Sequence, residues 1–286
     1  MVTSTEIGEI SKVIGEERAV ELVAKSGFGA WDYSMFAMTK FNHEIRLIEY
    51  TDHTLASDNY ASFSKRLRKI GEDNGIVCNQ AHAPFPTCLN KTDKIIKRAI
   101  ECSAIAGAKI CVVHPINNGS LIENAQMYKD LLPFAKEHGV KIATENMWNW
   151  NYDEGHAKTA ACSHHNEFKE YIDFVSDPYF TACLDIGHAE MKGLDTSAVL
   201  MIKTLADRIG ALHIHDNDLL YDCHGLPFTM KIDFNAVINA LKEIGYSGDV
   251  TLEVNGYLES KTESEIFEKL KNASSVANKI LNMLNS

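Results

Sequence analysis

The sequence has seven cysteines but contains no Cys-x-x-Cys pair. A zinc ribbon and a thioredoxin-like redox motif both need such a pair, so neither class is supported. Scattered, unpaired cysteines are typical of a reducing compartment, and we expect a cytoplasmic protein. Residues 1–10 also lack the basic and apolar regions of a signal peptide, which agrees with that expectation.

Excess positive charge and long apolar runs are missing as well. The formal net charge is −11 at pH 7, and an acidic surface of that size repels nucleic acid and anionic membranes. The basic run at 65–69 is most simply a solvated helix face. No stretch approaches the ~18 consecutive apolar residues of a membrane span. We therefore expect neither a nucleic-acid partner nor a membrane partner.

The sequence does contain a regular alternation of short apolar runs and longer amphipathic segments. Strands are expected at 1–5, 29–35, 76–82, 109–115, 141–147, 180–188, 209–217 and 249–256. Helices are expected at 16–27, 60–75, 91–107, 124–139, 167–177, 196–210, 233–248 and 263–284. Several of these helices end in glycine, which is a common C-terminal signal.

Eight strands that are each followed by a helix imply a parallel sheet. In a chain of this length the pattern predicts an α/β fold, a single (β/α)8 TIM barrel over residues 1–286. The alternative is an open doubly wound sheet. That fold normally has a glycine-rich phosphate turn after its first strand, and none is present here.

Acidic and imidazole side chains recur where the expected strands end. They are His82, His114, Glu145, Asp185, His188, His213 and Glu253. Barrel enzymes build their sites at this face, and neighbouring strands are only about 4.8 Å apart. Four of these residues lie on successive strands, so they are expected to converge on one ion: Glu145, Asp185, His213 and Glu253.

Each of these residues also has an ordinary structural explanation. A lone histidine at a strand end is more often a hydrogen-bonded structural residue, and a lone carboxylate such as Asp185 is usually the N-cap of the next helix. Burying so many polar groups together is costly unless something pairs them. The pattern therefore predicts a divalent metal ion. The mixed nitrogen and oxygen donors favour Zn²⁺ or Mn²⁺, with Mg²⁺ and Co²⁺ as alternatives.

The segment after the seventh strand is rich in histidine and aspartate. His213 and His215 lie on the same side of the strand, because side chains alternate. Asp216 is placed to orient an imidazole from behind. Asp222 and His224 follow in the loop and offer a second pair of ligands. Elsewhere, Trp148 opens a Trp-Asn-Trp segment that either packs within its loop or stacks on a sugar ring.

In these features the chain resembles the sugar phosphate isomerase/epimerase family of the xylose isomerase-like (endonuclease IV-like) TIM-barrel superfamily. The segments that carry the resemblance are ELVAKSGFGAWDYSM, ENM, LDIGHAEM, LHIHDND, YDCHG, IDF and LEVNGY, in order along nearly the whole chain. The resemblance implies that Glu145, Asp185, His213 and Glu253 hold one divalent ion. It also implies that Glu145 and Glu253 are the catalytic acid/base pair, and that His188 contacts substrate.

The same superfamily includes endonuclease IV, a trinuclear zinc phosphodiesterase. The resemblance to it would add five metal ligands: His82, His114, His188, Asp222 and His224. In a mononuclear enzyme, His82 and His114 would instead face substrate, with Trp148 beside them. The chain departs from the epimerase pattern at Leu219, where an arginine is usual, and at Trp31-Asp32, where a glutamate is common.

From the resemblance we expect a metal-dependent isomerase or epimerase of a small sugar or sugar phosphate, acting through a metal-stabilised enediolate. An inosose-type dehydratase, a trinuclear zinc phosphodiesterase and a barrel that binds sugar or metal without turnover remain alternatives. The acidic charge argues against the phosphodiesterase. The expected partner is a small sugar, and a homo-oligomer stays open.

Overall fold

Eight parallel strands form the centre of the protein in the computed structural model, which describes residues 1–42, 47–87 and 92–286. They are β1 (Thr3–Thr5), β2 (Ala30–Ser34), β5 (Val77–His82), β6 (Ile110–Val112), β7 (Lys141–Glu145), β10 (Phe180–Asp185), β11 (Ile209–His213) and β12 (Val250–Leu252). Each lies within a predicted strand, so the prediction of strand number and order is confirmed.

The parallel pairing runs around a ring. Six strands form one sheet in the order β11-β10-β7-β6-β5-β2, and β1 pairs with β12. Single bridges join the two sheets, between Glu6 and Asp32 on one side and between Ile214 and Leu252 on the other. The fold is the predicted α/β TIM barrel.

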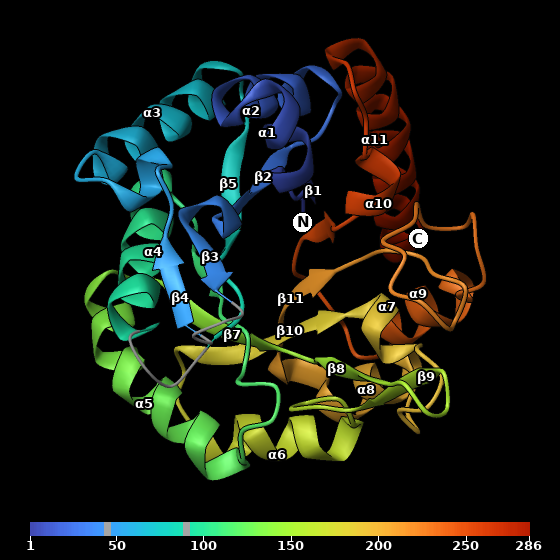
Figure 1. The fold of residues 1–286 in the computed structure, drawn as a ribbon. Helices are drawn as coiled ribbons and strands as arrows, with labels where there is room; N and C mark the ends of the chain where they lie inside the picture. The colour runs from blue at the N-terminus through green and yellow to red at the C-terminus, as the bar shows by residue number, and fades with distance from the viewer. Residues whose placement is uncertain (43–46, 88–91) are drawn as a thin grey trace.

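Helices form an outer ring around these strands (Figure 1). The main ones are α2 (Glu16–Lys25), α3 (Tyr60–Asp73), α4 (Thr92–Ala106), α5 (Leu121–Glu137), α6 (His165–Val175), α8 (Ala198–Leu205), α9 (Phe234–Glu243) and α11 (Glu263–Asn285). Lys91, the expected first residue of the third helix, lies outside the described residues. Local sequence sets several helix starts: Ser120 and Glu123 form a capping box before α5, and Asp233 caps α9.

Shorter elements are inserted between the repeating units, and the sequence did not predict them. They are α1 (Gly8–Ile14), η1 (Phe36–Met38), β3 (Thr39–Asn42), β4 (Leu47–Tyr50), η2 (Thr54–Ala56), β8 (Trp148–Asn151), β9 (His156–Thr159), α7 (Ile186–Ala189), η3 (Ala206–Arg208) and α10 (Asn255–Leu258). The pairs β3–β4 and β8–β9 are antiparallel hairpins. Among the described residues, no helix has both the length and the apolar character needed to cross a membrane.

The barrel interior places small apolar side chains under the candidate site. Ala143, Cys183 and Ala211 are buried and pack together. Each stands two residues before the last residue of its strand, on β7, β10 and β11. Because strand side chains alternate, the last residue points to the same side as the small one. The side chains of the candidate site, at the strand ends, therefore lie directly above a layer of small buried side chains in the barrel interior.

Candidate metal centre

Four predicted ligands meet at the carboxyl ends of four consecutive barrel strands. Glu145, Asp185 and His213 end β7, β10 and β11, and Glu253 follows β12. One donor atom from each lies within 4.8 Å of the others, and all four residues are buried. Nδ1 of His213 is 3.1 Å from Oε1 of Glu145 and 3.2 Å from Oε2 of Glu253. The structure thus brings the whole predicted set together.

The donor set fits a divalent cation. Three buried carboxyl groups surround one imidazole, and Glu145 Oε2 and Asp185 Oδ2 have no hydrogen-bond partner. Buried carboxylates without compensation are costly, so their convergence here calls for a cation. One imidazole nitrogen with several carboxylate oxygens matches the ligands of Zn²⁺ and Mn²⁺.

The two glutamates differ in electrostatic environment. Burial opposes ionisation of Glu145, but neighbouring imidazoles, chiefly that of His213, outweigh it and hold the pKa of Glu145 well below its ordinary value. Burial dominates at Glu253 and raises its pKa to about 8, although His213 and His224 act in the opposite direction. A divalent cation held between the two carboxylates would favour the ionised form of both.

The carboxylate of Asp32 lies beside Nε2 of the His213 ring, the nitrogen that faces away from Glu145 and Glu253. Its Oδ2 lies 3.4 Å from Nε2 of His213 and accepts a hydrogen bond of 2.8 Å from the side chain of Gln80. Asp32 is fully buried. A carboxylate behind a metal-ligating histidine fixes the ring and leaves its other nitrogen facing the ion. The sequence pattern showed only a departure at this position, because the family often has a glutamate there.

Asp185 combines a structural role with a site role. Its Oδ1 caps α7 by accepting from the backbone N–H of His188 at 2.7 Å. The Asn146 side chain binds the backbone of Asp185 on both sides, at 2.9 Å to its carbonyl and 2.8 Å from its amide. Oδ2 remains buried without a partner. The N-cap role therefore accounts for Oδ1 of Asp185, and Oδ2 remains available to a metal ion.

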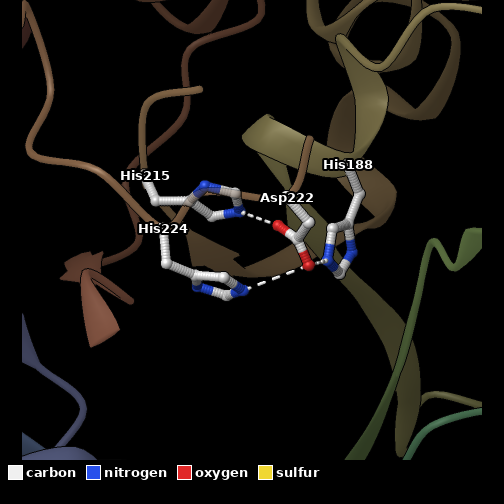
Figure 2. Close-up of side chains that lie close together, drawn as sticks. All are labelled: His188, His215, Asp222 and His224. Atoms are coloured by element: carbon white, nitrogen blue, oxygen red, sulfur yellow. Dashed lines mark hydrogen bonds and ion pairs between the residues drawn. The ribbon is translucent and has the colours of Figure 1, made fainter. Parts of the chain in front are cut away.

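A second cluster lies beside the first. Figure 2 shows three imidazoles pointing toward one carboxylate, that of Asp222. Oδ2 of Asp222 is 3.2 Å from Nε2 of His188 and 3.3 Å from Nε2 of His224, and Oδ1 is 3.5 Å from Nε2 of His215. Burial opposes these charges, but the carboxylate of Asp222 raises the pKa of His224 to about 10. One donor from each of the four residues lies within 4.8 Å of the others.

His215 is a member of this cluster that the sequence analysis did not assign. It is fully buried, and its Nε2 is 3.1 Å from Oδ1 of Asp185. His215 therefore stands between the two clusters. The signal was its spacing of two residues from His213, which puts both rings on the barrel side.

His82 and His114 form a third group with Glu145. Their Nε2 atoms are 3.1 Å apart, and Oε2 of Glu145 lies 3.5 Å and 3.3 Å from them. Burial and the neighbouring imidazoles lower the pKa of His82 to about 4, so its ring is neutral and able to bind a metal.

A cavity of about 350 Å³ opens above these groups. Its lining includes all the predicted site residues except the fully buried Asp185 and His213. Trp148, at the start of the β8–β9 hairpin, lines it with its ring 6.4 Å from that of His188. Phe36 and Phe85 line it as well, and both were missed because they lie in connections after the barrel strands, Phe36 in the short helix η1 and Phe85 in a bend. Aromatic side chains therefore form part of the wall of the cavity, and the imidazoles and carboxylates of the candidate site line its inner end.

Asp216 has a different role from the one suggested by its spacing. Its carboxylate accepts hydrogen bonds from the backbone amides of Asn217, Thr229, Met230 and Ile232, at 2.9, 3.1, 2.8 and 3.0 Å. These hydrogen bonds fix the conformation of the loop that carries Asp222 and His224. Asp216 positions ligands through the backbone and does not orient an imidazole.

Carboxylates and imidazoles cluster at the carboxyl ends of the strands of a parallel barrel, so the fold and the site define a TIM barrel with a candidate metal centre. The chain belongs to the xylose isomerase-like TIM barrel family, whose model matches residues 20–273. The predicted resemblance to this superfamily is confirmed.

Solved structures and a curated relative agree with this fold. A D-tagatose 3-epimerase-like protein is 20% identical, with a TM-score of 0.74 over 100% of this chain and 98% of the other. The IOLI protein, solved with a zinc atom, is also 20% identical, with a TM-score of 0.67 over 100% and 98%. Uncharacterized protein MJ1311 of Methanocaldococcus jannaschii is 25% identical over 88% of this chain and 83% of its own length.

Proposed function

We propose that this protein is a divalent-metal-dependent isomerase or epimerase of a small sugar. The observation that carries the proposal is the placement of one carboxylate oxygen of Glu145 and one of Glu253 close to His213 Nδ1, at 3.1 and 3.2 Å. The two strands β10 and β11 separate β7 from β12 in the ring. The two carboxylates therefore reach the site from different directions, as an acid/base pair that serves two faces of one carbon requires.

The metal would be held by Glu145, Asp185, His213 and Glu253. When bound, a divalent cation would polarise the carbonyl of the sugar and acidify the adjacent carbon-bound proton.

The protein's own residues would carry the proton. One glutamate removes it from the carbon next to the carbonyl, and the other returns it. His188 faces the cavity, and its Nδ1 lies 2.9 Å from the backbone carbonyl of Asn146, which fixes the ring. Its other nitrogen is then available to a substrate hydroxyl or to Asp222. Phe36 and Trp148 would cover the sugar and exclude water.

The fold relatives support a sugar substrate, since one is described as D-tagatose 3-epimerase-like. A substrate-lining set of imidazoles, carboxylates and aromatic rings also suits a polyol.

A trinuclear phosphodiesterase is the second candidate. The specific observation in its favour is that the described residues form five overlapping groups of possible ligands, which centre on three places: His213, Asp222, and the pair His82 and His114. The net charge of −11 opposes binding to a polyanion. An inosose-type dehydratase uses the same first proton abstraction and is separated from the isomerase only by its product.

A proton-exchange screen tests the proposal. Ketoses, aldoses and inososes are each incubated in D₂O with the protein and Zn²⁺, Mn²⁺, Mg²⁺ or Co²⁺. We expect deuterium at the carbon next to the carbonyl of at least one ketose or aldose, and a product of unchanged mass apart from deuterium. A product that has lost water would identify the dehydratase. No exchange with any sugar, together with cleavage of a phosphodiester, would replace the proposal by the second candidate.

A further inference from the structure

A second cavity adjoins the candidate metal centre. It has a volume of about 420 Å³ and lies between helix α1, the end of β2 and the segment that follows it. Phe36 and Asn255 line both this cavity and the one above the metal ligands. The two cavities are therefore neighbours that share part of their walls. We call this space the Glu6 cavity.

The Glu6 cavity contains buried polar atoms without partners. Glu6 is 1% exposed and Ser34 is 5% exposed. Glu6 Oε2, the Ser34 hydroxyl and Asn255 Oδ1 are buried and have no hydrogen-bond partner. Buried polar atoms in native proteins are normally paired, so three unpaired ones in one cavity point to a ligand that supplies hydrogen-bond donors.

Gly8 brings two of these groups together. Its backbone N–H donates to Glu6 Oε1 at 2.6 Å. A side chain at Gly8 would collide with both the Glu6 carboxylate and the Ser34 hydroxyl. The absence of a side chain there leaves the Glu6 carboxylate and the Ser34 hydroxyl close to each other at the wall of the cavity.

The charges around the cavity disfavour an anion. Among its described lining residues the cationic side chains are Lys12 and His53. Lys12 pairs with Glu9 at 2.5 Å, and His53 Nε2 pairs with Glu16 at 2.8 Å. Glu6 is left without a cationic partner among the described residues. Arg and Lys side chains are common phosphate donors, and neither this cavity nor the adjoining one offers one unpaired in the described part of the chain.

We propose that the Glu6 cavity binds the uncharged, hydroxyl-rich end of the substrate, so that the protein acts on an unphosphorylated sugar. This inference rests on the proposed function. Hydroxyl groups of the sugar donate to Glu6 Oε2 and to Asn255 Oδ1, and they exchange hydrogen bonds with Ser34. A phosphate at the same end would meet the Glu6 carboxyl group and no free cation.

The test measures binding rather than turnover. D-fructose and D-fructose 6-phosphate are titrated into the zinc-loaded protein, and binding is followed by tryptophan fluorescence, because Trp148 lines the adjoining cavity. We expect the neutral sugar to bind at least about tenfold more tightly than its phosphate. The titrations are made at pH 8.5, above the pKa of about 7 that burial gives Glu6, so that its carboxyl group is ionised. Glu6→Gln then keeps the shape of the side chain and removes its charge, and should reduce that preference about fivefold.

Glu17→Gln is the matched control. It changes the net charge equally, but Glu17 is an exposed residue of α2 that pairs with Arg66 and does not line the cavity. The preference should be unchanged in this variant. Should Glu6→Gln fail to fold, Ser34→Ala replaces it and should weaken binding of D-fructose roughly twofold to tenfold through the lost hydrogen bond.

Two results would overturn the inference. Equal or tighter binding of the phosphate by the wild-type protein would show that the remote end is anionic. An unchanged preference in Glu6→Gln, or unchanged binding in Ser34→Ala, would show a cavity filled by solvent. Loss of deuterium exchange with every sugar would refute the proposed function but leave this binding preference measurable, so the two failures are distinguishable.

Discussion

Replacing Asp32 by asparagine should weaken metal binding without weakening the fold. Asp32 touches no proposed substrate position, and acts on the site through Nε2 of His213, 3.4 Å away. Removing a carboxylate behind a metal-ligating histidine typically lowers metal affinity about 10–100-fold, or about 1.4–2.8 kcal/mol. Asparagine retains an oxygen to accept from Gln80, so the local hydrogen bond at 2.8 Å can persist.

The stability of Asp32→Asn should not fall together with its metal affinity. Oδ1 of Asp32 is buried without a partner. Asparagine removes the cost of burying that charge, and although Nε2 of His213 loses a partner, Glu145 and Glu253 still compensate the imidazole at Nδ1. We therefore expect an equal or higher free energy of unfolding in the presence of chelator. A purely structural role for Asp32 predicts the opposite, a less stable protein whose metal affinity changes only through unfolding.

The assay is a competition titration against a chromophoric chelator, paired with urea unfolding in EDTA. Asp73→Asn serves as the control, because Asp73 is an exposed residue of α3 paired with Lys69. Metal affinity of Asp32→Asn equal to that of the wild type would refute the idea that Asp32 orients His213.

Three further predictions follow from the site and its surroundings. Elemental analysis of protein purified without chelator should find at least one divalent ion per chain, and Asp185→Asn and His213→Ala should each lower that occupancy; full occupancy in both would remove the proposed ligand set. If the Asp222 cluster binds a metal, His215→Ala should reduce the stoichiometry by about one ion, whereas a wild-type stoichiometry of one with activity retained would exclude the trinuclear assignment. Burial raises the pKa of Glu6 from 4.5 to about 7, so the native state keeps a proton that the unfolded chain loses, and the free energy of unfolding should fall between these pH values by about 3 kcal/mol. Urea unfolding at pH 5 and pH 8 should show a fall that is smaller in Glu6→Gln than in the wild type by about that amount, because Glu253, whose pKa burial also raises, contributes equally to both proteins; an equal fall in both would reject the assignment.

The strands and the positions of the proposed ligands could be predicted because local patterns encode them. Each barrel strand is a short apolar run followed by an amphipathic helix, and the carboxyl ends of parallel strands meet at one face. Glu145, Asp185 and His213 follow directly from that rule, since each ends its strand. That these three side chains lie close together could therefore be predicted without knowing the conformation of any loop.

The rest of the cavity is built from segments whose positions are set by contacts with residues distant in the sequence. The hairpins β3–β4 and β8–β9 have strands of four residues, too short for a periodic pattern to stand out. Asp216 was given the wrong role because three of the four amides that its carboxylate binds lie 13 to 16 residues further along the chain. The cavity beside Glu6 depends on packing between α1 and β2, which spacing along the sequence does not reveal.

Deuterium exchange by the two glutamate variants tests the central claim most directly. A sugar that exchanges with the wild-type protein is incubated in D₂O with Glu145→Gln, Glu253→Gln and the control Glu154→Gln, whose side chain is 62% exposed. Each glutamine at the site keeps one oxygen ligand, so metal content is measured alongside.

The account predicts that exchange at the carbon next to the carbonyl falls about 10²–10⁴-fold or more in both site variants, and stays at the wild-type rate in the control. Exchange at the wild-type rate in both site variants, with the metal still bound, would contradict it, because some other residue would then be the base.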